Sequence, residues 1–341
     1  MYLIEPIRDG KYLADGALVL AMQVYVLKNL NLDETIIFPY YCEPKVEIGR
    51  FQNAEVEVNH EYMKENNVIL VRRDTGGGAI YVDKGAVNVC FIMPKNTEVY
   101  GNYKEFYRPA VAALHKLVAT QVQQTGRNDL TADGKKVSGA AMTMVGDKVY
   151  GGYSLLVDVD YDAMVSVLNP NRKKIDSKGI QSVRQRVMGM RELFKPEYQN
   201  ITIDEFKEYI ICQLMEIDSI DQAKRYELTQ EDWAAIDELV ATKYKNWDWN
   251  YGSSPRYSYN RDARVEGVGT IDISLEVEQG RIDKCRIYGD FFGKGDIQVV
   301  EQALVGVRVI DTELLAALEA LDLTHYFGPI KAQDLVELIL S

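Results

Sequence analysis

The chain has 341 residues, 47% of them hydrophobic, and 39 Lys and Arg against 51 Asp and Glu give a net charge of −12. A chain of this length exceeds what one hydrophobic core usually organises, so we predict a large domain and a smaller one. The acidic balance disfavours broad binding of a nucleic-acid backbone, because phosphates attract basic surfaces. Nucleic acid is therefore not an expected partner.

The sequence also disfavours secretion, membrane insertion and histidine chemistry. The first residues lack a basic segment followed by an apolar one, and the most apolar run, 17–27, is shorter than the roughly 20 residues of a membrane span. The four cysteines are widely spaced without a paired-thiol motif, which is typical of a reduced cytoplasmic protein. His60, His115 and His325 stand outside any cluster of carboxylates or thiols, so we expect no histidine-based metal cage.

The first half of the chain alternates helices and strands. Asp15 precedes the apolar run 17–27 and predicts a capped, largely buried helix. Short apolar runs rich in β-branched residues predict strands at 68–71, 79–82, 87–93 and 149–159. Pro109 is placed at the start of a helix that ends at Gly126. Asp133-Gly134 indicates a hairpin turn.

The second half contains a composition change near residue 252. The pattern is helical after Thr202, and the segment 247–259, rich in Gly, Ser, Pro and Tyr, is interpreted as a linker. Strands are predicted at 270–278 and 281–288, joined at Gln279-Gly280, and helices near 297–305, 312–320 and 331–340. We therefore predict a catalytic domain over 1–252 and an accessory domain over 253–341.

The sharpest motif is Val71-Arg72-Arg73-Asp74-Thr75-Gly76-Gly77-Gly78-Ala79-Ile80-Tyr81-Val82-Asp83. Three consecutive glycines let the backbone approach a ligand and turn several N–H groups towards one point, with two arginines beside them for an anion. A tight turn with solvated arginines is the simpler interpretation, but the arginine pair favours anion binding. The motif matches neither the phosphate loop ending in Gly-Lys-Ser/Thr nor the dinucleotide fingerprint.

A second motif surrounds the predicted hairpin. It reads Gly126-Arg127-Asn128-Asp129-Leu130, and after the turn Gly134-Lys135-Lys136-Val137-Ser138-Gly139. A lysine in a strand that leaves a tight turn is held rigidly and can neutralise negative charge at a reacting phosphate. Most lysines are simply solvated, and position alone does not distinguish the two roles.

Both motifs resemble signatures of the lipoate-protein ligase family, and two further segments, 48–53 and 177–184, resemble its Ile-Gly-x-x-Gln-Asn and Lys-Gly-Ile-x-Ser-Val-Arg elements. Four ordered motifs span most of residues 48–190. The resemblance implies an α+β fold. Its large domain has a mixed or antiparallel sheet with flanking helices, as in the class II synthetase-like biotin/lipoate ligases, and its C-terminal accessory domain is small and also α+β.

The resemblance also implies site residues. Lys136 matches the catalytic lysine, which contacts the acyl carboxylate and the adenylate phosphate. Asn128 and Asp129 match residues near the nucleotide phosphate, with Asp129 as the magnesium ligand. The other implied substrate-binding or ATP-binding residues are Arg73, Thr75, Gly76, Gly77, Gly78, Ala79, Ser138, Gly139, Lys178 and Gly179.

The implied activity is that of an ATP-dependent ligase. Lipoate and MgATP give lipoyl-AMP, and the lipoyl group then passes to the ε-amine of a lysine. The implied carriers are lipoyl domains of 2-oxoacid dehydrogenase acyltransferase subunits or the glycine-cleavage H protein. ATP and Mg²⁺ are the implied cofactors, and a cytoplasmic monomer is the default expectation.

Other functions stay open at this point. Biotin-protein ligases share the implied fold but carry a Gly-Arg-Gly-Arg loop that this chain lacks. Octanoyltransferases of the same superfamily use a cysteine nucleophile in a polar loop, whereas Cys90 stands in an apolar strand and is expected to pack in the core. A non-catalytic regulator that binds lipoate or the carrier would be marked by loss of the lysine, and Lys136 is present.

Departures from the family pattern concern substrate preference. Val82 and Ala86 stand where relatives usually have His and Asn, so acyl-chain and acceptor preference are expected to differ. Residues 171–191 hold seven basic side chains against one acid, Asp176. We predict that this basic stretch docks an acidic carrier, with Arg172, Lys173 and Lys174 as the first candidates.

Overall fold

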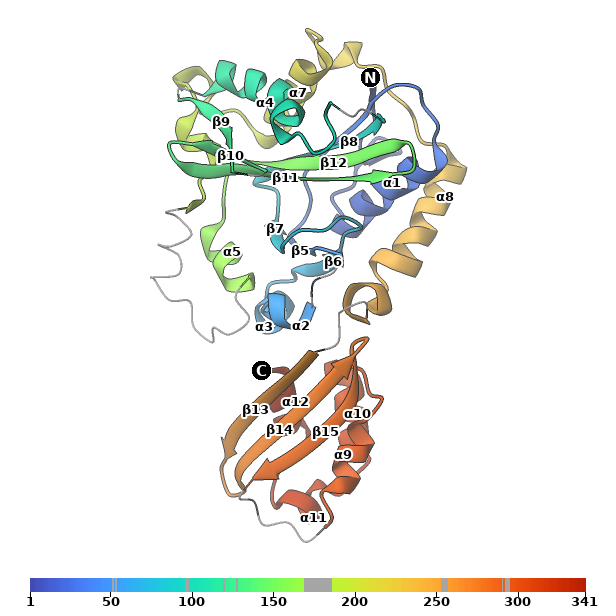
Figure 1. The fold of residues 1–341 in the computed structure, drawn as a ribbon, viewed down its shortest axis with the longest axis vertical. Helices are drawn as coiled ribbons and strands as arrows, with labels where there is room; N and C mark the ends of the chain where they lie inside the picture. Colours follow the sequence, from blue (N-terminus) through green and yellow to red (C-terminus); the bar gives the residue numbers. More distant parts are fainter. Residues whose placement is uncertain are drawn as a thin grey trace. The chain divides into compact units, whose positions relative to one another are not determined.

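The computed structural model describes residues 1–50, 52, 54–95, 98–118, 120–126, 128–168, 186–252, 257–289, 291 and 295–341. The chain forms two compact units, Met1–Asn246 and Trp247–Ser341 (Figure 1). In the described part of the chain, no helix combines the length and the apolar character needed to cross a membrane.

A seven-stranded mixed sheet is the centre of the first unit. All its neighbouring strands run antiparallel except the parallel pair β1 and β4. In spatial order the strands are β1 (Tyr2–Leu3), β4 (Ile36–Tyr40), β8 (Ala86–Pro94), β12 (Lys148–Leu156), β11 (Lys135–Val145), β10 (Asp129–Ala132) and β9 (Val122–Thr125). The predicted fold class, a large mixed sheet with flanking helices, is confirmed.

One face of this sheet carries the main hydrophobic core. Val87 and Val89 of β8 and Leu155 of β12 lie in one buried cluster with side chains of α4 (Tyr103–Leu117) and α7 (Ile203–Met215). Figure 1 shows both helices on the same side of the sheet. Because side chains alternate along a strand, the residues between these positions project from the opposite face.

Helix α4 differs from its prediction. It begins at Tyr103, where Asn102 accepts a hydrogen bond from the backbone of Glu105, so Pro109 lies inside the helix. It ends at Leu117, and residues 122–125 form strand β9 instead. Proline removes one backbone hydrogen bond, but a helix side that buries several large side chains in the core offsets this loss.

The opposite face of the large sheet carries α1 (Gly16–Asn29) and a second sheet of three strands. The predicted N-cap of α1 is confirmed, because Asp15 accepts hydrogen bonds from the backbone of Ala17 and Leu18. The small sheet has the order β6 (Ile69–Arg72), β5 (Lys45–Ile48) and β7 (Ile80–Val82). Val19, Tyr40, Cys42 and Val82 form one buried cluster that joins α1, the large sheet and the small sheet.

The other elements of the first unit are short or peripheral. The two-stranded sheet is β2 (Ile7–Arg8) with β3 (Lys11–Tyr12). The helices are α2 (Ala54–Glu57), α3 (His60–Glu65), α5 (Tyr161–Val167), α8 (Gln230–Leu239), the 3₁₀ turns η1 (Met190–Leu193), η2 (Pro196–Tyr198) and η3 (Ile220–Gln222), and the π-helical turn η4 (Val240–Tyr244).

The second unit has its own core between a three-stranded antiparallel sheet and the helices that follow it in the chain. The hairpin predicted at Gln279-Gly280 is confirmed, and both residues have positive φ. The predicted linker is not irregular throughout, because it contains a π-helical turn and the start of β13. Helix α11 was not predicted from the sequence. The elements are η5 (Asp248–Gly252), β13 (Tyr257–Val265), β14 (Gly269–Glu278), β15 (Arg281–Gly289), α9 (Gln298–Leu304), α10 (Asp311–Glu319), α11 (Leu323–Phe327) and α12 (Ala332–Leu340).

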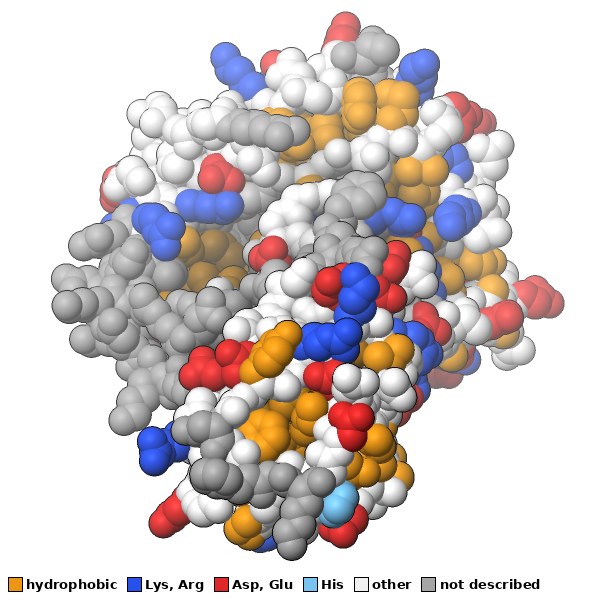
Figure 2. Space-filling model, turned by 60° about the horizontal axis from the view of Figure 1, so that its bottom comes forward, with side chains coloured by type: hydrophobic (Ala, Val, Ile, Leu, Met, Phe, Trp, Pro, Cys, Tyr) orange, Lys and Arg blue, Asp and Glu red, His pale blue; other side chains and the backbone are white. Residues whose placement is uncertain are grey.

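Charged side chains of both signs mix on the face of the molecule shown in Figure 2. Among the described side chains on that face, basic and acidic groups alternate with patches of apolar surface.

Candidate active site

The second sequence motif folds as the β10–β11 hairpin. Asp133 and Gly134 have φ of 49° and 75°, the geometry of a two-residue turn that matches the twist of the strands. The hairpin predicted from these two residues is confirmed. It places Asp129 in β10 beside Gly139 in β11.

A β-bulge decides which way Lys136 points. Leu130 pairs with Ser138 but Thr131 pairs with Lys136, so Val137 is an extra residue in β11. Val137 lies in the main core, and the consecutive residue Ser138 contacts Tyr107 of the same core, so both side chains project from one face, as a bulge permits. The bulge therefore turns Lys136 to the face of the sheet from which Asp129 and Gly139 project.

On that face Lys136 pairs with Asp129. Its Nζ lies 2.8 Å from Asp129 Oδ1, and the two side chains are 39% and 36% exposed. A Cβ atom built on Gly139 would lie 2.9 Å from the same Nζ, so the ammonium group occupies the space that a side chain at Gly139 would take. Half-exposed groups of opposite charge are accessible to a ligand.

Two other predicted site residues brace the hairpin. The Ser138 hydroxyl is buried on the core face, 3.1 Å from the hydroxyl of Tyr107. Asn128 donates from Nδ2 to the carbonyl oxygen of Ala140 at 2.6 Å. The structure thus brings Asp129, Lys136 and Gly139 together and directs the Ser138 side chain to the opposite face.

The glycine motif connects strands that are not neighbours. β6 and β7 lie on either side of β5, so the connection crosses the end of β5 instead of forming a hairpin turn. The crossing brings Gly77 against Gly49, where a Cβ atom would lie 2.0 Å from the Gly77 carbonyl oxygen. Gly77 has a φ of 109°, which side chains rarely tolerate. The close approach explains glycine at both positions.

Arg73 holds the glycine loop from inside. Its Nη2 donates to the carbonyl oxygens of Gly76 and Gly78 at 3.0 and 2.9 Å, and its Nε donates to Thr75 Oγ1 at 3.1 Å. In a trans peptide the carbonyl and the next N–H point in opposite directions. The N–H groups of Gly77 and Ala79 therefore point away from Arg73, on a loop whose glycines are exposed.

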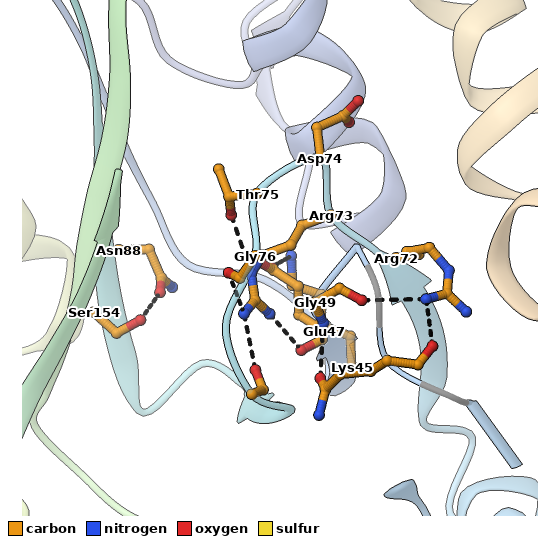
Figure 3. A network of polar contacts seen from close by, with 12 residues as sticks. Lys45, Glu47, Gly49, Arg72, Arg73, Asp74, Thr75, Gly76, Asn88 and Ser154 are labelled. Carbon is orange, nitrogen blue, oxygen red and sulfur yellow. Dashed lines mark hydrogen bonds and ion pairs between the residues drawn. The ribbon is translucent and has the colours of Figure 1, made fainter. Parts of the chain in front are cut away.

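A buried charge network supports Arg73 (Figure 3). Glu47 Oε2 lies 2.9 Å from Lys45 Nζ, and Glu47 Oε1 lies 4.0 Å from Arg73 Nε. Burial alone raises the pKa of Glu47, but Lys45 and Arg73 outweigh it and hold that pKa below its ordinary value. The sequence does not mark Lys45 and Glu47 as buried, because a charged residue at every second position is typical of a half-exposed strand.

Arg72 organises the neighbouring motif at residues 48–53. Its side chain is fully buried, and Nη1 donates to the carbonyl oxygens of Gly49, Arg50 and Gln52 at 3.2, 3.0 and 2.6 Å. Both arginines are buried, so neither is a solvated surface residue, and binding of a substrate anion by Arg73 stays a prediction. Both guanidinium groups donate to backbone carbonyls and shape the loop.

Asp74 ties the glycine loop to the end of the first unit. Lys243 donates to its Oδ1 at 2.6 Å and Tyr244 donates to its Oδ2, both from the π-helical turn η4. The sequence pattern does not predict this contact, because 169 residues separate Asp74 from Lys243 along the chain.

Cys90 is a free, buried thiol, as expected from the sequence. Burial raises its pKa well above the ordinary value, which disfavours the thiolate that a nucleophile requires. The structure does not support the transferase mechanism with this residue as nucleophile.

Some predicted residues lie outside the described part. Lys178, Gly179, Arg172, Lys173 and Lys174 all fall within 169–185. At the end of the basic stretch, Arg191 forms a two-pronged pair with Asp158, with nitrogen–oxygen distances of 2.8 and 2.7 Å. Arg191 is therefore engaged within the fold.

Comparisons with known proteins agree with these motifs. Residues 15–215 match the lipoyl protein ligase A/B catalytic domain family, and residues 254–339 match the bacterial lipoate protein ligase C-terminus. Lipoate–protein ligase 2 of Staphylococcus aureus is 60% identical over the full length of both chains.

Solved structures agree as well. The bipartite lipoate protein ligase of Thermoplasma acidophilum has 26% identity and a TM-score of 0.62, over 75% of this chain and 98% of its own. A lipoate-protein ligase A bound with ATP has 25% identity and a TM-score of 0.57, over 74% and 98%. The chain is therefore an enzyme of the lipoate-protein ligase family.

Proposed function

We propose that this ligase activates lipoate with ATP to lipoyl-AMP and then transfers the lipoyl group to a lysine of a carrier protein. The observation that carries the proposal is the cluster of Lys136, Asp129 and Gly139 on one face of the β10–β11 hairpin. The cluster presents a cation and a carboxylate at an accessible position. Lipoate-protein ligase A with bound ATP supports the choice of nucleotide.

In the first half-reaction the lipoate carboxylate attacks the α-phosphate of ATP and pyrophosphate leaves. Both reactants are anions, and negative charge gathers on the oxygens around the α-phosphorus. The Lys136 ammonium offsets this charge from a fixed position, which lowers the activation barrier. The outward N–H groups of Gly77 and Ala79 are suited to donate to phosphate oxygens in the same way.

Magnesium would be held by Asp129. Mg²⁺ commonly binds one or two protein carboxylates together with substrate phosphates. Among the described residues, no three His, Cys, Asp or Glu side chains gather into a metal cage, and Asp129 fits the simpler arrangement as a half-exposed carboxylate. When bound, the ion would neutralise phosphate charge.

In the second half-reaction the carrier lysine attacks the carbonyl carbon of lipoyl-AMP and AMP leaves. The bipartite ligase of Thermoplasma acidophilum was described with its E2 lipoyl domain, which supports lipoyl domains as carriers here, with the glycine-cleavage H protein as a further candidate.

We also propose that the catalytic domain spans 1–252 and the accessory domain 253–341. The four free cysteines fit a location in the reducing cytoplasm.

The test is lipoate-dependent exchange of pyrophosphate into ATP by the full chain with Mg²⁺, followed by transfer to a purified lipoyl domain or H protein. We expect exchange without carrier and a mass increase of the carrier with it. Transfer from an octanoylated carrier without ATP would instead indicate a transferase. Lipoate binding without exchange would indicate a non-catalytic regulator.

A further inference from the structure

Small residues form a strip across the face of the large sheet that carries Lys136. In register, Asp129 of β10 pairs with Gly139, Gly139 with Ser154, and Ser154 with Asn88 of β8. The next row on the same face is Ala141, Gly152 and Cys90. Gly139, Ala141, Gly152 and Ser154 are partly exposed although they lie in central strands.

Asn88 lies at the β8 end of this strip, and one polar atom of its side-chain amide has no partner among the described residues. Its side chain is 5% exposed, and its Oδ1 accepts a hydrogen bond from Ser154 Oγ at 2.6 Å (Figure 3). Its Nδ2 has no hydrogen-bond partner among the described residues. If the amide is turned over, the nitrogen meets Ser154 and the oxygen is left without a partner, so one polar atom is unpaired in either orientation.

An unpaired buried polar atom needs an explanation. Leaving such a group without a partner costs about 1–3 kcal/mol, and native proteins retain few of them. The strand pairs Asn88 with Tyr40, an aromatic residue that is itself buried. The strip of small residues is therefore the side from which a ligand atom can reach the Asn88 amide.

The distance between Asn88 and Lys136 indicates which atom of the ligand the Asn88 amide can contact. Asn88 and Gly139 are two strands apart, a separation of roughly 10 Å at a strand spacing of about 4.8 Å. Lys136 Nζ stands beside Gly139, so Asn88 is too far away to share the group bound by Lys136. With C–C bonds of about 1.5 Å, the ring sulfurs of lipoate lie roughly 7–9 Å from its carboxyl carbon in an extended chain.

We propose that Asn88 is a specificity-determining residue whose amide, oriented by Ser154, donates a hydrogen bond to a ring sulfur of the acyl substrate. The inference rests on the proposed function, in which Lys136 binds the carboxylate end. The acyl chain then lies across the strip, above Gly139 and Gly152. Sulfur is a weak acceptor, so the bond selects between substrates rather than supplying most of the affinity.

The experiment compares lipoate with 5-cyclopentylpentanoate, which has a ring of the same size without sulfur. The ratio of the two kcat/KM values is measured by acid-dependent pyrophosphate exchange for the unaltered full chain and for Asn88→Leu. We expect the unaltered protein to prefer lipoate and Asn88→Leu to reduce this preference roughly three- to tenfold. A folded Asn88→Leu protein with an unchanged ratio overturns the inference.

Two further variants keep the result interpretable. Tyr153→Phe removes an unpaired buried hydroxyl from the core face of β12, the strand that carries Ser154, and its ratio should stay unchanged. If Asn88→Leu does not fold, Ser154→Ala, which removes only the group that orients the amide, decides the matter: a smaller loss of preference supports the inference and an unchanged ratio overturns it. Absence of lipoate-dependent exchange in the unaltered chain would instead overturn the proposed function, and with it the basis of the inference.

Discussion

Lys136 Nζ lies 2.8 Å from Asp129 Oδ1, across two strands whose register is shifted by a bulge at Val137. Exposed ion pairs contribute little to folding, typically about 0–1 kcal/mol. The pair is therefore not required for the fold, and its two charges are free to exchange partners when a ligand arrives.

Replacement of Lys136 by alanine should remove adenylate formation and leave the fold intact. The charge is needed where the transition state gains negative charge, and loss of such a group lowers kcat by about 10²–10³-fold. Lys135→Ala is the matched control and should keep near-normal activity. Lipoate-dependent pyrophosphate exchange measures both, and near-normal exchange by Lys136→Ala would exclude the assigned role.

Gly139→Ala should displace the Lys136 ammonium group without unfolding the protein. The added Cβ would lie 2.9 Å from Nζ and 3.0 Å from Cε of Lys136, the far end of a flexible side chain. We expect a loss of about tenfold or more in kcat, since a displacement of about 1 Å can cost 10²-fold. Thermal melting should change little. A normal kcat would show that the ammonium position is unimportant.

Glu47→Gln should destabilise the protein strongly, because it leaves the fully buried Lys45 without a counter-charge. Breaking a buried pair costs about 3–5 kcal/mol. The matched control is Glu43→Gln, which breaks the exposed pair between Glu43 and Lys84 and should cost less than about 1 kcal/mol. Urea denaturation of the two variants tests the difference, and equal free energies of unfolding would contradict this prediction.

Acid should weaken the protein through Glu5. Burial raises the pKa of Glu5, but Lys207 at 2.8 Å and Arg225 at 2.6 Å outweigh it and lower that pKa. A carboxyl whose folded pKa is depressed stabilises the fold fully above its unfolded pKa of about 4.3 and loses this contribution as pH falls through the folded pKa.

The measurement is the free energy of unfolding of the unaltered protein and Glu5→Gln, from pH 6 down to pH 3. The unaltered protein should be more stable at pH 6, and the difference should shrink below about pH 4. A difference that is constant over this range would show that Glu5 is not titrating.

Cys90→Ser should retain ATP-dependent ligation at a substantial level. The thiol is buried and its pKa is raised, so it contributes packing rather than nucleophilicity. Some loss of stability is expected from the buried hydroxyl. A folded variant that forms lipoyl-AMP yet transfers no acyl group to the carrier would indicate a thioester intermediate instead.

Local chemistry in the sequence was sufficient for several features. The cap at Asp15 and the hairpin turns at Asp133-Gly134 and Gln279-Gly280 depend on residues close together along the chain, so their patterns predicted them. The same holds for strands β6, β7, β8, β12, β14 and β15, whereas β4, β5 and β13 were not predicted. The order of the motifs was also enough to identify the ligase family. The predicted start of α4 was wrong because proline usually marks the first turn of a helix. Whether a helix continues past a proline depends on the burial of its side chains in the core, which the local sequence does not reveal.

Tertiary structure decided the rest, because it depends on which segments meet. The glycine loop needs Gly77 because it crosses the end of β5 against Gly49, 28 positions earlier in the chain. The orientation of Lys136 depends on a bulge, and a shift of one residue turns every side chain to the other face of a sheet. Lys45 and Glu47 look like surface charges in the sequence, but both are buried in the fold. There Glu47 provides the negative charge beside the buried guanidinium group of Arg73, which donates to the carbonyl oxygen of Gly76.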